Sequence, residues 1–152
     1  MRSRQLDNAL VSARYLHPAD VVVSALGVND VTSQRGASAF VRDYLELLST
    51  VVRRTGARGF VLCGLPPMQL LPAAAQPLRW YLGQCSTRLN VALRRFCDEH
   101  ENSRFISIDW ASPDDMAHDS FHPGKKLYYE WAQRVAHEII ALNTQRGMVK
   151  DA

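Results

Sequence analysis

The chain alternates short apolar runs with longer segments in which apolar residues recur every three or four positions. The runs, rich in Val, Ile, Leu and Phe, predict strands near residues 20–26, 58–64 and 104–109, the first of them buried on both faces. The three-to-four spacing predicts amphipathic helices. Four helical faces are expected: Leu6, Leu10, Ala13 and Leu16; Val41, Tyr44, Leu45, Leu48, Val51 and Val52; Leu78, Leu82, Cys85, Leu89, Ala92, Leu93 and Phe96; Leu127, Trp131, Val135, Ile139 and Leu142.

Expected strands and helices follow one another in strict alternation. Strands separated by helices need right-handed crossovers, which give a parallel sheet covered by helices on both faces. No internal repeat, low-complexity segment or linker interrupts the pattern. We therefore predict one α/β domain over residues 1–152, built as a three-layer sandwich with a short parallel sheet.

Composition narrows the functional classes. Hydrophobic residues make up 47% of the 152 residues and charged residues 22%, as is typical of soluble globular proteins. The net charge of +3 is small and the Arg residues are scattered, so we expect no nucleic-acid surface. No run approaches the ~18 apolar residues of a membrane span, and no secretory signal is evident. The three cysteines lack CxxC spacing, which suits a reducing compartment, and we expect the cytoplasm.

Two polar clusters follow expected strands. Gly27–Asp30 comes after the first strand, and Asp114–His122 comes after the third. The carboxyl ends of parallel strands meet at one edge of a sheet, where ligands bind. Within the second cluster, Asp119 precedes His122 by three positions. In a turn, its carboxylate can hold the imidazole so that the other ring nitrogen acts as a general base.

Other interpretations of these residues stay open. Asp119 and Pro123 are also typical of a turn that begins a helix, and Asn29 followed by Asp30 is a common turn pair. His118 and His122 are spaced as in some zinc sites. Pro123 favours a turn over the helix that such a site would need, so we expect neither metal nor cofactor.

Taken together, the two clusters resemble motifs of the SGNH (GDSL-type) ester hydrolases. GVND after a VVVS strand resembles the block whose Asn donates to the oxyanion, and DSFHP resembles the block that supplies the Asp and His. GLPPM, QPLRWYLG and the FHPG…WA pattern fit as well, so the resemblance covers roughly residues 15 to 142. It implies a flavodoxin-like fold and hydrolysis of small acyl esters without a cofactor. By this resemblance Asn29 and Gly27 form the oxyanion site, His122 is the base and Asp119 its orienting carboxylate.

The nucleophile of that family has no counterpart in this sequence. Neither Gly-Asp-Ser nor a G-x-S-x-G elbow occurs. The resemblance therefore implies an N-terminally truncated member whose first two strands are missing. The remaining candidate hydroxyls are Ser33, on the same loop as Asn29, and Ser120, beside His122 where relatives commonly have Gly.

Two functions follow. The first is a short-chain carboxylic ester hydrolase in which His122 activates another hydroxyl or a water molecule. The second is a catalytically impaired module for binding or assembly. Loss of the neighbouring strand would leave the strand over residues 21–26 at the sheet edge, and apolar edges pair readily. We accordingly expect a homodimer formed through this strand.

Overall fold

The computed structural model describes the chain except residues 1–3, 34, 71–73, 110, 119–121 and 151–152, and leaves out the side chains of residues 4–5 and 146–150. Its sheet contains β1 (Val21–Ser24), β2 (Gly59–Cys63) and β3 (Ser103–Ile106) in that order. Both pairings are parallel, with Val22 opposite Phe60 and Phe60 opposite Ser103. The three predicted strands and their parallel arrangement are confirmed.

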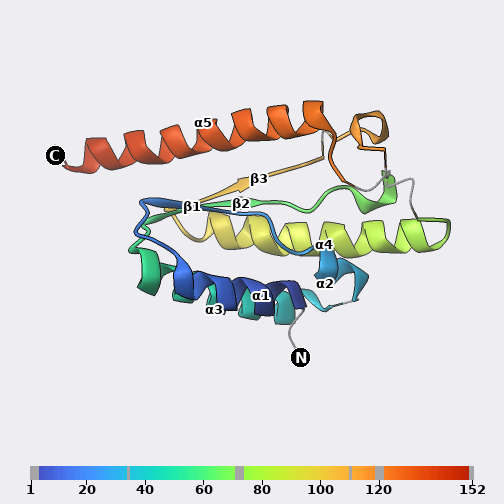
Figure 1. Cartoon of the computed structure of the whole chain (residues 1–152), viewed down its shortest axis with the longest axis horizontal. Helices are drawn as coiled ribbons and strands as arrows, with labels where there is room; N and C mark the ends of the chain where they lie inside the picture. The colour runs from blue at the N-terminus through green and yellow to red at the C-terminus, as the bar shows by residue number, and fades with distance from the viewer. Residues whose placement is uncertain (1–3, 34, 71–73, 110, 119–121, 151–152) are drawn as a thin grey trace.

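Helices cover both faces of this sheet, as Figure 1 shows. One face carries α5 (Lys125–Lys150), whereas α1, α3 and α4 lie on the other. The α/β three-layer sandwich predicted from the sequence is therefore confirmed. The remaining helices have these bounds: α1 Arg4–Ser12, α2 Val28–Thr32, α3 Ala37–Thr55 and α4 Leu78–Asp98.

The core lies mainly between the sheet and α1, α3 and α4. Phe40, Tyr44 and Leu89 are buried there, and a smaller cluster around Val61 lies beneath α5. The Tyr44 hydroxyl donates a hydrogen bond of 2.6 Å to Ser24 Oγ. This bond ties α3 to β1, the strand that leads into the first polar cluster.

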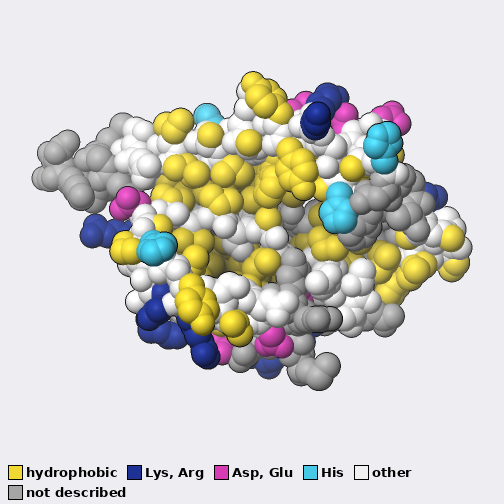
Figure 2. Space-filling view, in the orientation of Figure 1, with side chains coloured by type: hydrophobic (Ala, Val, Ile, Leu, Met, Phe, Trp, Pro, Cys, Tyr) yellow, Lys and Arg dark blue, Asp and Glu magenta, His cyan; other side chains and the backbone are white. Residues whose placement is uncertain are grey.

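One prediction about β1 is wrong. We expected this strand to be buried on both faces, but Val23 is 40% exposed. The reason is that β1 is an edge strand and α5 packs over β2 and β3. In Figure 2, hydrophobic side chains accordingly gather on the exposed surface below α5.

Candidate functional site

A cavity of about 370 Å³ opens at the carboxyl ends of the three strands. Each strand contributes to its lining through the segment that follows it, and the loop before α5 and the first turns of α5 complete the wall. The described lining residues that these segments supply include Leu26, Asn29, Leu65, Ile108, His122 and Trp131. The cavity therefore lies where the topology of a parallel sheet predicts a ligand site.

Asn29 reaches this cavity from the first turn of α2. The chain leaves β1 at Ser24 and turns at Gly27, whose φ of 128° is rare for residues with a side chain. A Cβ atom at Gly27 would also lie 3.1 Å from Leu65 Cδ2 and 3.2 Å from Phe40 Cζ. The backbone angle therefore favours glycine here, and the close packing leaves little room for a side chain. Gly27 is buried, while Asn29 is exposed at the cavity.

His122 lines the same cavity from the loop between β3 and α5. The Ala117 N–H donates to the His122 carbonyl at 2.8 Å, and the Gly124 N–H donates to the Asp115 carbonyl at 2.8 Å. A Cβ atom at Gly124 would lie 2.5 Å from that Asp115 oxygen, so only glycine lets the two ends of the loop approach. These contacts hold the loop closed and leave the His122 side chain exposed. Asp119 and Ser120 lie outside the described residues.

Two contacts that the sequence did not reveal hold the cavity wall. The side chain of Asn90 on α4 accepts a bond from the Leu65 N–H at 2.7 Å and donates to the Leu65 carbonyl at 3.0 Å. The Trp131 indole N–H donates to Cys63 Sγ at 3.2 Å. Burial raises the pKa of the Cys63 thiol, which keeps it protonated and unsuited to nucleophilic attack. The wall is thus fixed by residues on α4, α5 and β2.

A comparison with protein families identifies the family of this chain. The model of the GDSL-like lipase/acylhydrolase family matches residues 1–129. The chain belongs to this family. The resemblance on which Asn29 and His122 were selected is therefore confirmed at the level of the family. Comparisons with curated proteins and with solved structures gave no match.

Ser33, one of the two candidate nucleophiles of this GDSL-like protein, lies apart from the described lining of the cavity. Ser33 follows α2, and its hydroxyl donates to the Asn29 carbonyl at 2.6 Å. This contact satisfies the end of a helix, and Ser33 is not among the described residues that line the cavity. Among those lining residues no Ser, Thr or Cys occurs, and Tyr128 carries the only hydroxyl.

In the part of the chain that the structure describes, no group of three His, Cys, Asp or Glu side chains is placed to hold a metal ion. None of the helices described there is both long enough and apolar enough to cross a membrane. His118, which we weighed as a metal ligand with His122, is exposed on the loop before α5.

Proposed function

We propose that this protein hydrolyses small acyl esters in the cavity between Asn29 and His122. One observation carries the proposal: the amide and the imidazole, which lie far apart in the sequence, line the same cavity at the carboxyl end of the sheet. The membership of the chain in a lipase/acylhydrolase family supports the reaction class. An oxyanion donor and a general base facing one space are the parts that acyl transfer needs.

The proposed reaction begins with the ester carbonyl against Asn29. A water molecule, or a hydroxyl group, attacks the acyl carbon while His122 takes the proton from the attacking oxygen. The carbonyl electrons move to the oxygen, and the Asn29 side-chain N–H donates to the resulting oxyanion. When the intermediate collapses, the carbon–oxygen bond to the alcohol breaks and the imidazolium returns the proton to the alcohol. We assign Asp119 to orienting the imidazole.

The cavity favours a short acyl chain. Its volume of about 370 Å³ is near the lower end of the range of small-molecule sites. Leu26, Leu65 and Trp131 present apolar surface to it, so an acyl chain gains from burial there. Without a serine in the described wall, we expect a slow reaction, because an oxyanion site and binding alone retain about 10³-fold over water.

Hydrolysis of 4-nitrophenyl esters tests this function. The acetate should be cleaved faster than the octanoate, and His122→Ala should abolish most of the rate. His17→Ala is the matched control, because His17 is exposed and precedes β1 at the other end of that strand. Equal rates for wild type and His122→Ala would refute the assignment.

A second candidate function, assembly through β1, is favoured by the exposed edge of the sheet. The Asp20 carbonyl accepts a bond from the Gly59 N–H at 3.2 Å, so it points toward β2. Because successive residues of a strand point their N–H and C=O groups to alternate sides, those of Val21 and Val23 point outward. Two copies paired antiparallel about Val22 would satisfy these groups reciprocally, and we propose this two-fold contact as the basis of assembly.

A further inference from the structure

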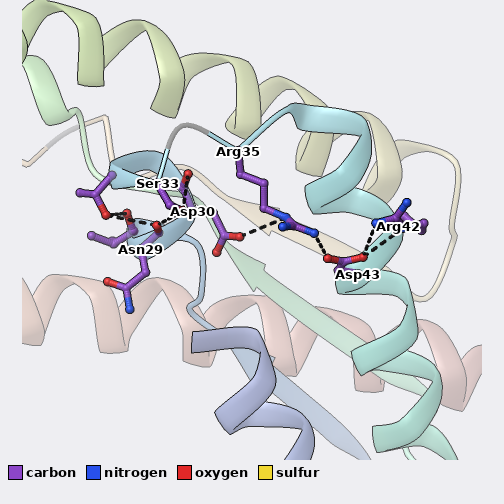
Figure 3. A network of polar contacts seen from close by, with 8 residues as sticks. Asn29, Asp30, Ser33, Arg35, Arg42 and Asp43 are labelled. Carbon is purple, nitrogen blue, oxygen red and sulfur yellow. Dashed lines mark hydrogen bonds and ion pairs between the residues drawn. The ribbon is translucent and has the colours of Figure 1, made fainter. Parts of the chain in front are cut away.

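An ionic network begins at Asp30, the residue after Asn29, and runs away from Asn29 toward α3 (Figure 3). Arg35, on the segment between α2 and α3, binds the carboxylate of Asp43 on α3 through one guanidinium nitrogen. Its Nε lies 3.7 Å from Asp30 Oδ1, in α2. The second oxygen of Asp43 accepts a bond of 3.0 Å from Arg42. The guanidinium group of Arg35 therefore lies between carboxylates of two different helices.

Burial makes this network strong. The side chain of Asp30 is fully buried, and those of Asp43 and Arg35 are 3% and 11% exposed. Charges screened so little by water interact strongly, and removing one of them leaves its partners charged in a poor solvent. Arg42 differs, because its side chain is 73% exposed. Loss of Arg42 would leave the link from α2 to α3 in place, whereas loss of Arg35 would break it.

The short helix α2 depends on such a link. It has only five residues, and no side chain caps its amino end at Gly27. A helix of this length is not stable by its own hydrogen bonds, so contacts with the rest of the protein must set its orientation. Asp30 is the neighbour of Asn29 in α2, and its carbonyl accepts a further bond of 3.0 Å from the Arg35 N–H. Arg35 thus contacts the residue after Asn29 through both its backbone and its side chain.

We propose that Arg35 is a positioning residue, which fixes the direction of the Asn29 amide by tethering Asp30 to Asp43. In Figure 3 the Asn29 side chain points away from the network. The tether therefore holds the helix on another side and leaves the amide available to a ligand. The importance for catalysis rests on the proposed oxyanion role of Asn29. A displacement of about 1 Å in a catalytic group costs up to about a hundredfold in rate. The contacts that hold α2 in place therefore matter for the rate.

Arg35→Lys tests the proposal, with Arg42→Lys as its matched control. Lysine keeps the charge but cannot span two carboxylates as a planar guanidinium does. In Arg35→Lys we expect the side-chain amide signals of Asn29 to move in ¹H–¹⁵N spectra. For 4-nitrophenyl acetate, we expect kcat to fall about tenfold while KM stays within about twofold. Arg42→Lys should leave the signals and both constants as in wild type. A general loss of structure would instead move signals throughout the spectrum.

Asp30→Asn provides a second route if Arg35→Lys does not fold, because it removes only one charge of the network at nearly constant size. Asn29 signals at wild-type positions in either folded variant would overturn the proposal, as would equal shifts in Arg42→Lys. The spectra also separate this proposal from the proposed function. If wild type cleaves no ester but the Asn29 signals move in Arg35→Lys, ester hydrolysis is refuted and the tether is supported. If Asn29→Ala lowers kcat while the Arg35 variant leaves the Asn29 signals unmoved, the tether alone is refuted.

Discussion

Replacing Gly27 by alanine should destabilise the protein strongly, because two separate effects act at this position. The φ of 128° is one that residues with a Cβ rarely adopt, which costs about 1–3 kcal/mol. The new methyl group would also lie 3.1 Å from Leu65 and 3.2 Å from the buried Phe40 ring. Overpacking of this kind costs about 1–3 kcal/mol. We therefore expect the free energy of unfolding to fall by about 3 kcal/mol.

Two other glycines separate these effects. Gly56 has a φ of 71° but nothing within 4 Å of an added Cβ, so Gly56→Ala should lose only the conformational part, about 1 kcal/mol. Gly36 has a φ of −68° and an equally open surrounding, so Gly36→Ala should stay within about 0.5 kcal/mol of wild type. Equilibrium unfolding in urea measures all three variants. If Gly27→Ala were no less stable than Gly56→Ala, the close packing of α2 against Leu65 and Phe40 would be refuted.

Two further predictions concern the cysteines and the sheet edge. Burial, together with nearby Asp98, raises the pKa of the Cys97 thiol to about 12. The unfolded chain therefore loses this proton at lower pH than the folded one, and the free energy of unfolding should fall as the pH rises from about 9 toward 12. Urea unfolding should show a shallower pH dependence in Cys97→Ala, and identical slopes would contradict the assignment. At the edge of β1, Val23→Lys should convert a dimer to a monomer in light scattering at micromolar concentration, whereas a monomeric wild type would refute the two-fold contact.

The elements that the sequence predicted well are those with a clear local pattern. The three strands coincide with short apolar runs, and the helices α3, α4 and α5 coincide with segments in which apolar residues recur every three or four positions. The helix α2 has no such signal, because its five residues make less than two turns. The Val-rich run did not by itself reveal the exposure of Val23, because such a run looks the same at the edge of a sheet as in its centre. The edge position of this strand followed only from the resemblance to a family whose first two strands are missing here.

Some residues of the candidate site were likewise predictable from the sequence, and others were not. Asn29 and His122 were predictable because each follows a strand, and topology brings strand ends together. The link from Arg35 to Asp30 and Asp43 was not predictable, because salt bridges between helices have no fixed sequence spacing. The assignments of Asp119 and Ser120 stay predictions, as they lie outside the described residues.

The most direct test of the whole account is the effect of Asn29→Ala on the hydrolysis of 4-nitrophenyl acetate. An amide that donates only to the developing oxyanion contributes to the transition state and not to substrate binding. We predict that kcat falls about a hundredfold while KM hardly changes. Asn102→Ala is the matched control, because Asn102 is exposed just before β3, at the opposite edge of the sheet, and should leave both constants as in wild type. An unchanged kcat in Asn29→Ala would contradict the account.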